Sequence, residues 1–127
     1  MSAAHDVGKA INPVACEGQI EGGAIMGAGA ALYETLVYDN QGNIKNPSFL
    51  DYHLVTSADV PALTAIVVEE PLKHGPFGAK GVGEPPVALS PAAIGNAVTD
   101  ATGTRIRDLP LKPERVYWAI NRPGSNE

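Results

Sequence analysis

The sequence predicts an α+β domain built from mixed helices and short strands. Two short apolar runs, Ala3–Val7 and Leu63–Glu69, are typical of strands, and the second has Ile, Val and Val at its centre. Two longer segments open with a capping side chain followed by proline, the usual start of a helix. With 127 residues, 44% of them hydrophobic, the chain can bury one core. We therefore expect residues 1–127 to form one domain or part of one.

The first half of the chain is predicted to hold one long helix. Asn12 supplies the N-cap and Pro13 the preset first turn, and the helix is expected to run to about Tyr33. β-Branched and aromatic residues at 35–38, a turn at 39–42 and a possible partner strand from Ile44 predict a short hairpin. Residues 47–59 show no clear period and are interpreted as irregular or as a short helix.

The second half is predicted to alternate loops and helices. A loop over 71–86 should precede a helix with Ser90 as N-cap and Pro91 in the first turn, which Gly103 terminates. Residues 105–111 are expected to be extended. Pro113 opens a last short helix to about residue 120, followed by a polar tail over about residues 121–127.

Composition excludes several functions. The net charge of −5 comes without a basic run, so neither nucleic acid nor a membrane surface is an expected partner. One cysteine cannot form an internal disulfide, and neither a signal peptide nor a membrane span is visible, so a cytoplasmic location is expected. The three histidines and the cysteine are too dispersed for a zinc site, and no protein metal ligand is assigned. These residues are His5, His53, His74 and Cys16.

The long helix carries an unusual number of glycines around one amide. Glycines at 18, 22, 23, 27 and 29 each cost about 0.5–1 kcal/mol in a helix interior relative to alanine. On helical spacing Gln19 shares its face with Gly22, Gly23 and Met26. Such a bare face admits either a second helix or a rigid ligand that the amide can hydrogen-bond, and both interpretations stay open.

The most informative run is Gly75–Pro86, a glycine-rich loop that ends in Glu84 followed by two prolines. Pro85 favours an extended backbone at Glu84, which would present the carboxylate as a candidate general base. An idle surface glutamate is the competing interpretation. Lys80 is interpreted as a solvated cation. Because Lys80 is followed by glycine rather than serine or threonine, a nucleotide-binding P-loop is excluded.

Other side chains are assigned to packing. Cys16 is interpreted as a small buried hydrophobe. The aromatic residues are assigned to the core, and they include Tyr33, Tyr38, Phe49 and Trp118.

Three ordered motifs resemble the large subunit of the molybdenum hydroxylases, the family of xanthine dehydrogenase and aldehyde oxidase. They are Asp6-Val7-Gly8-Lys9-Ala10-Ile11-Asn12-Pro13, Gly18-Gln19-Ile20-Glu21-Gly22-Gly23 and Gly78-Ala79-Lys80-Gly81-Val82-Gly83-Glu84-Pro85. The resemblance covers nearly the whole chain and implies a C-terminal part of a molybdopterin-binding domain.

The resemblance implies roles for specific residues. Glu84 matches the family's base, which takes a proton from a molybdenum-bound hydroxyl while its oxygen, derived from water, attacks an electron-poor carbon. Gln19 matches the glutamine that hydrogen-bonds the molybdopterin, and Gly81, Val82 and Gly83 lie in the cofactor-binding motif. In the family hydride then passes to a sulfido ligand, and the electrons leave through iron–sulfur clusters.

The resemblance also implies partners. The family's other pterin-binding and substrate-binding loops are not in this sequence, so we expect a fragment that is inactive without the remainder of the large subunit. Iron–sulfur clusters and FAD are expected only on partner domains or chains, and the substrate is expected to be an aldehyde or a purine-like N-heterocycle. Two alternatives remain: a non-catalytic module that keeps the fold without cofactor, and a small anion-binding domain that uses the amides of residues 75–83.

Overall fold

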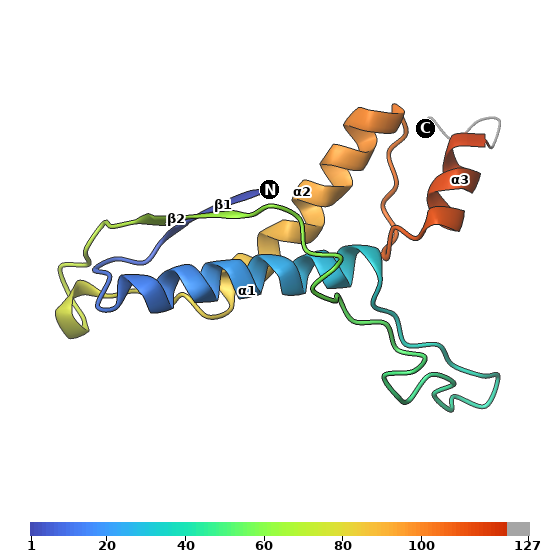
Figure 1. Ribbon diagram of the computed structural model, residues 1–127, viewed down its shortest axis with the longest axis horizontal. Coiled ribbons are helices and arrows are strands. Elements are labelled where there is room, and N and C mark those ends of the chain that lie inside the picture. Colours follow the sequence, from blue (N-terminus) through green and yellow to red (C-terminus); the bar gives the residue numbers. More distant parts are fainter. Residues whose placement is uncertain (122–127) are drawn as a thin grey trace.

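The computed structural model of the chain describes residues 1–121 and is an α+β structure (Figure 1). Its elements are, in order, β1 (Ser2–Asp6), α1 (Pro13–Leu32), β2 (Thr64–Val68), the short 3-10 helix η1 (Pro76–Gly78), α2 (Pro85–Thr102) and α3 (Pro113–Asn121). The predicted fold class, both strands, the first helix and the last helix are confirmed. The polar tail lies beyond residue 121, apart from its first residue, and so outside the described residues.

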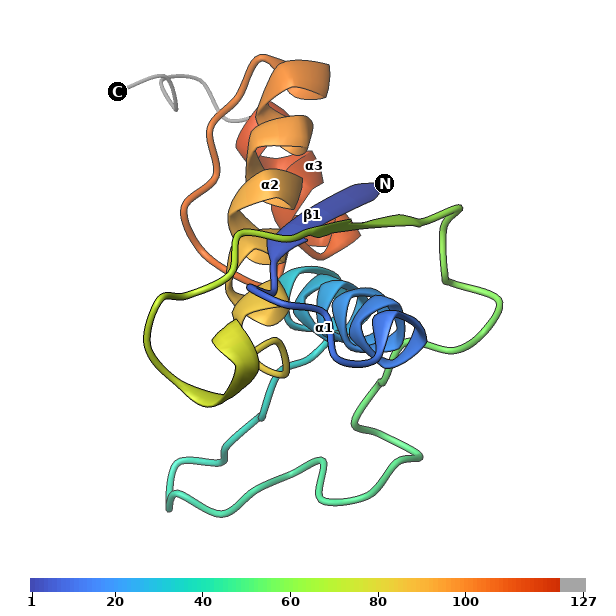
Figure 2. The ribbon, with the colours of Figure 1, turned by 90° about the vertical axis from the view of Figure 1, so that its left-hand side faces the viewer.

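The two strands pair in parallel across one side of α1 (Figures 1 and 2). The register joins Ser2 to Thr64 and Asp6 to Val68. Parallel neighbours need a long crossover, which α1 and the irregular 33–63 segment supply here. The N-cap is as predicted, because the Asn12 side chain accepts a 3.1 Å hydrogen bond from the backbone N–H of Ala15.

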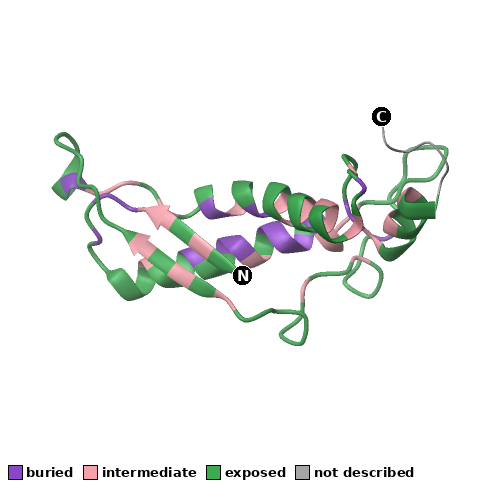
Figure 3. Cartoon of the chain, turned by 90° about the horizontal axis from the view of Figure 1, so that it is seen from above, coloured by how far each residue is buried: buried purple, intermediate pink, exposed green. Residues whose placement is uncertain are grey.

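A small aliphatic cluster lies where the sheet meets the first half of α1. Val7, Ala10 and Ile20 are buried, and half-buried apolar residues pack around them, with Cys16 among them as a small hydrophobe. The buried side of α1 continues as alanine and glycine, visible as the purple stretch of Figure 3. The core therefore relies on small residues that let elements approach closely.

Helix α2 packs against the glycine face of α1. A Cβ added at Gly27 would lie 2.5 Å from the Val87 carbonyl oxygen and 2.6 Å from the Ser90 Cβ, and one added at Gly23 would lie 2.8 Å from the Pro86 Cβ. The backbones could not come this close with larger residues. Helix packing is thus the role of these two glycines.

The predicted start of α2 was wrong. The helix begins at Pro85 with Glu84 as N-cap, and Pro91 lies inside it. Ser90 caps nothing; its hydroxyl is buried and donates to the Pro86 carbonyl at 3.4 Å. The end was correct, because Gly103 adopts the left-handed conformation with φ 71°. Proline fits either start, and the pair at 85–86 is the one used.

The predicted hairpin is reduced to a single antiparallel bridge between Tyr38 and Ile44. The buried side chain of Asn46 organises this loop, because it accepts from the N–H of Val37 at 2.8 Å and donates to the carbonyl of Thr35 at 2.7 Å. Side-chain bonds replace the ladder that a longer hairpin would form. Residues 47–59 are irregular, as expected.

The assignment of aromatic residues to the core was wrong for Tyr38, Phe49 and Trp118, whereas Tyr33 is half-buried. Phe49 is 82% exposed and Trp118 is 55% exposed, and Tyr38 is exposed as well. They lie on the 33–63 segment and on α3, away from the aliphatic cluster, whose space is filled by small residues. Within residues 1–121, no helix combines the length and apolarity needed to cross a membrane.

Candidate functional site

Gln19 lies in the first half of α1 with its side chain exposed. The neighbouring Gly18 and Gly22 would meet nothing within 4 Å if each carried a Cβ. The glycines of α1 therefore differ in their surroundings: Gly23 and Gly27 are packed against α2 and Gly29 against Glu34 and Val55, whereas Gly18 and Gly22 leave open space beside Gln19. The face inferred from the sequence is thus open at Gly22 but covered by Pro86 at Gly23.

The Gly78–Glu84 loop is tied to the segment that follows β1. The Gly78 carbonyl accepts the N–H of Lys9 at 2.9 Å and the N–H of Leu72 at 3.0 Å. The N–H of Lys80 in turn donates to the Val7 carbonyl at 2.9 Å. Backbone bonds thus join the start of this loop to the chain segment that leads into α1.

Lys80 is not the solvated cation that the sequence suggested. Its ammonium is paired with the Asp6 carboxylate, and only 27% of the Lys80 side chain is exposed. Asp6 also accepts the N–H of Gly8 at 2.8 Å. The hydrogen bond from Lys80, followed by that from Gly8, holds the pKa of Asp6 below its usual value. The carboxylate joins two segments that are 74 residues apart.

Gly81, Val82 and Gly83 offer backbone donors. Their N–H groups make no hydrogen bond within residues 1–121. The Val82 side chain packs against the buried aliphatic cluster, which fixes the middle of the run, while Gly81 and Gly83 are exposed. Successive amide donors on a fixed loop suit a ligand rich in hydrogen-bond acceptors.

Glu84 stands at the N-cap of α2 with an exposed side chain. Its backbone is helical, with φ −95° and ψ −34°, so the expected extended conformation was wrong. The carboxylate makes no capping hydrogen bond. An N-cap side chain usually accepts from the second or third helical residue. Here the second is Pro86, which has no N–H, and the N–H of Val87 donates to the Glu84 carbonyl at 3.0 Å.

The fold brings the Gln19 side chain to the loop that carries Glu84. A Cβ added at Gly83 would lie 3.5 Å from the Gln19 Oε1, so the amide of Gln19 lies against the residue that precedes Glu84. Open glycine surface, an exposed amide and loop N–H groups that make no hydrogen bond within residues 1–121 therefore lie close to the backbone that carries Glu84. This set fits a bulky planar group with many hydrogen-bonding atoms, such as a pterin, next to a proton-transfer step.

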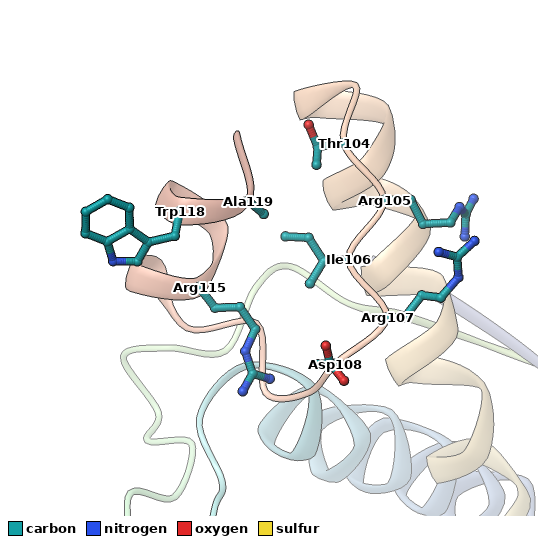
Figure 4. Close-up of a pocket in the computed structure, with 8 residues that line it drawn as sticks. All are labelled: Thr104, Arg105, Ile106, Arg107, Asp108, Arg115, Trp118 and Ala119. Atoms are coloured by element: carbon teal, nitrogen blue, oxygen red, sulfur yellow. The ribbon is translucent and has the colours of Figure 1, made fainter. Parts of the chain in front are cut away.

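A surface cavity of about 580 Å³ lies elsewhere, between residues 104–108 and α3 (Figure 4). The side chain of Ile106 points toward α3 across it, whereas Trp118 points away. None of the candidate site residues lines this cavity. Residues 1–121 contain no group of histidine, cysteine, aspartate or glutamate side chains that could hold a metal ion.

Sequence reasoning missed Asp6 and the pairing of Lys80. A local signal was present, because aspartate two residues before glycine is a common turn in which the carboxylate accepts the glycine N–H. The partner on the distant loop had no local signal.

Comparisons with known proteins show which family the chain resembles. A family model described as a molybdopterin cofactor-binding domain matches residues 1–61. The putative xanthine dehydrogenase molybdenum-binding subunit XdhA of Escherichia coli K12 is 45% identical over 121 residues, which are 94% of this chain and 16% of that protein. The aldehyde oxidoreductase of Megalodesulfovibrio gigas is 39% identical over 121 residues, 94% of this chain and 13% of that protein.

Solved structures give the same result. The crystal structure of quinoline 2-oxidoreductase from Pseudomonas putida 86 superposes with a TM-score of 0.88 at 36% identity, over 96% of this chain and 16% of that one. The fold and the sequence thus define a molybdopterin cofactor-binding segment. More particularly, the chain matches part of the large subunit of the molybdenum hydroxylases, the family of xanthine dehydrogenase and aldehyde oxidoreductase. It spans 13–16% of the length of these relatives.

Proposed function

We propose that this chain contributes the general base and part of the cofactor contact to the active site of a molybdenum hydroxylase. Glu84 is the base, Gln19 hydrogen-bonds the pterin, and the N–H groups of Gly81, Val82 and Gly83 line the cofactor. The reaction would convert a C–H carbon of an aldehyde or N-heterocycle to C–OH, with oxygen from water and release of two electrons and two protons.

The observation that carries this proposal is the contact between Gln19 and Gly83. These residues are far apart in sequence, yet the Gln19 Oε1 lies 3.5 Å from the position of a Cβ at Gly83. A site assembled from distant segments, with glycines where side chains would intrude, is what binding of a large rigid cofactor requires. Packing alone accounts for Gly23 and Gly27 but leaves Gly18, Gly22 and Gly81 unexplained.

The residues of the chain would act in two ways: Gln19 would hold the pterin, and Glu84 would accept a proton. Gln19 can both donate and accept through its amide, so it orients a pterin edge that has both kinds of atom. Glu84 accepts a proton at its carboxylate, which no capping bond occupies. The molybdenum cofactor, when bound, would supply the two-electron redox chemistry.

The remaining parts of such an enzyme would come from elsewhere. The chain covers about 16% of the molybdenum-binding subunit that it resembles, so the remainder of a large subunit would complete the pterin and substrate pockets. Iron–sulfur clusters, and FAD where present, would lie on partner domains or chains and receive the electrons. Molybdenum and pterin analysis of the natively purified protein, with mass spectrometry of the accompanying chains, tests this composition.

The decisive variant is Glu84→Gln in the holoenzyme, which keeps the size of the side chain but cannot accept the proton. We expect kcat/KM to fall by about 10²–10⁴-fold with molybdenum content unchanged. Glu114→Gln on α3 is the matched control, since Glu114 is exposed and remote from the site, and it should keep full activity. Full activity of Glu84→Gln would refute the assignment. A natively purified protein without metal would favour the non-catalytic module instead.

A further inference from the structure

We propose that Asp6 and Lys80 are positioning residues for Glu84. Their ion pair holds the Gly78–Glu84 loop against the end of β1, and so fixes the carboxylate relative to Gln19. This inference rests on the proposed function for its catalytic consequence, and on the structure alone for its mechanical part.

The Asp6–Lys80 pair joins two chain segments, one that leads to Gln19 and one that leads to Glu84. From Asp6 the chain passes through a tight turn into α1 and reaches Gln19 after 13 residues. From Lys80 it reaches Glu84 after four residues. Fixing Asp6 to Lys80 therefore limits how far Gln19 and Glu84 can move apart, because both connecting segments are short or helical.

The Asp6 carboxylate makes a hydrogen bond to each of these two segments. Its Oδ1 accepts the N–H of Gly8 at 2.8 Å, which shapes the turn after β1, and its Oδ2 accepts the Lys80 ammonium. One side chain thus sets the turn on its own segment and holds the distant loop. A charge-assisted bond of this kind is stronger than one between neutral groups.

The surrounding backbone leaves little room for another arrangement. Gly8 has φ +64°, and a Cβ there would lie 2.3 Å from the Gly78 carbonyl oxygen and 2.9 Å from the Lys80 nitrogen. The two segments are therefore in direct backbone contact at Gly8. Backbone hydrogen bonds hold their spacing and Val82 adds apolar packing, while the ion pair is the one side-chain hydrogen bond that joins β1 to this loop among residues 1–121.

A second ion pair nearby provides a natural comparison. Lys9 pairs with Glu69 at 3.0 Å, but the Lys9 side chain is 54% exposed, against 27% for Lys80. Glu69 lies just beyond β2 and does not belong to the Gly78–Glu84 loop. An exposed pair of this kind contributes little, and its loss leaves the loop attached. Lys9→Met is therefore the matched control for Lys80→Met.

The test uses the holoenzyme and two independent measurements. Hydrogen–deuterium exchange of peptides covering residues 6–10 and 78–84 reports attachment without any need for turnover. We expect Lys80→Met to speed this exchange about fivefold, whereas Lys9→Met does not. In steady-state kinetics we expect Lys80→Met to lower kcat by about 10–100-fold, with KM within about twofold and molybdenum content retained.

A conservative variant and a double variant distinguish a positioning role of the ion pair from simple destabilisation of the fold. Lys80→Arg keeps the charge and should restore most of kcat and the slow exchange, and Asp6→Asn should resemble Lys80→Met because it keeps the turn but loses the charge. The double variant Asp6→Asn/Lys80→Met should be little worse than either single one, since both remove the same link.

The outcomes distinguish this inference from the proposed function. Unchanged exchange in Lys80→Met, or a Lys80→Arg variant as impaired as Lys80→Met, would overturn the positioning role, whatever Glu84→Gln does. Faster exchange with unchanged kcat would overturn its catalytic consequence. Retained activity in Glu84→Gln alone would instead remove the proposed base.

Discussion

Two prolines explain why a glutamate at a helix start is left uncommitted. A carboxylate at an N-cap is normally drawn to the amide of the second or third helical residue. After Glu84 the first two residues are Pro85 and Pro86, which have no N–H, and the N–H of Val87 is used by the Glu84 carbonyl. The helix starts without the side chain, so no capping hydrogen bond holds the Glu84 carboxylate.

Gln19 allows a residue-scale prediction about cofactor retention. Gln19→Leu keeps a similar volume but removes both donor and acceptor, and a hydrogen bond contributes about 0.5–1.5 kcal/mol. We expect the variant to bind the pterin cofactor about 2–10-fold more weakly, measured as molybdenum and pterin content after extended dialysis. Glu17→Gln, on another side of α1, should retain wild-type content. Equal retention by both variants would remove Gln19 from the site.

Asp6 gives a prediction about pH. Its pKa is lowered in the fold by Lys80 and Gly8, so the ion pair stabilises the protein above the ordinary value of 3.8 and is lost as pH falls through the lower folded value. The Tm difference between wild type and Asp6→Asn should be constant from about pH 7 to about pH 5, and should shrink only below pH 3.8. A difference that already disappears at about pH 5 would contradict the lowered pKa.

For single residues, the sequence predicts a role where the local pattern is distinctive and misses a role that depends on a distant partner. Gln19 and Glu84 stand out because glycine surrounds them, and residue spacing on a helix identifies the open face. Lys80 looked idle because its partner is 74 residues away. No local pattern encodes a pair that exists only after β1 and the loop have come together.

Among the elements, the close contact of α1 and α2 depends on a proline. In a regular helix the Val87 carbonyl would accept the N–H of residue 91, but Pro91 has none. That carbonyl lies against Gly27, where a Cβ would be only 2.5 Å away. Pro91 and Gly27 thus form a complementary pair, and this explains why proline is tolerated inside α2.

Gly27→Ala should therefore destabilise the protein. The new methyl group meets the Val87 carbonyl and the Ser90 Cβ, and overpacking of this kind costs about 1–3 kcal/mol. Gly95→Ala is the matched control in α2, because a Cβ there meets nothing within 4 Å and alanine favours a helix by about 0.5–1 kcal/mol. We expect the Tm of the protein to fall for Gly27→Ala and to stay or rise for Gly95→Ala. The reverse order would disprove the close packing.

The start of α2 shows where element prediction fails. Serine followed by proline at 90–91 and proline at 85–86 are both acceptable first turns. The choice is made by packing, since Pro86 is buried against Gly23, and only an earlier start delivers it there. Helix boundaries that have a strong local signal and no alternative nearby were predicted correctly, as at Asn12-Pro13 and Gly103.

The whole molecule exposes more surface than its size warrants. Its accessible area is 8752 Å², whereas a compact monomer of 13.2 kDa exposes about 6400 Å². The exposed aromatic and apolar side chains lie mainly on the 33–63 segment and on α3. The fold class could be predicted because it depends on the order of the elements. The small size of the core could not, because composition does not determine how closely the elements pack.

This surface predicts the behaviour of the 127-residue chain expressed alone. With so much apolar area in water, it should lack a cooperative thermal transition as a monomer, and should either aggregate or remain loosely packed. Circular dichroism on heating, together with light scattering, measures both properties. A sharp reversible transition of a monomer would show that the core seen here is sufficient.

The parallel register of β1 and β2 has a consequence in time. Ser2 pairs with Thr64, so the sheet closes a loop of about 60 residues before it gains any contact, and such closure is slow compared with the formation of helices. The attachment of the Gly78–Glu84 loop to the segment after β1 also joins residues far apart in the sequence, Lys9 to Gly78 and Lys80 to Val7, so it too must wait for a long loop to close. Helix α1, with Gln19, should form early during biosynthesis, whereas the complete proposed site, Gln19 together with the Gly78–Glu84 loop, should form late. A cofactor would therefore encounter α1 with Gln19 before the Gly78–Glu84 loop is in place beside it.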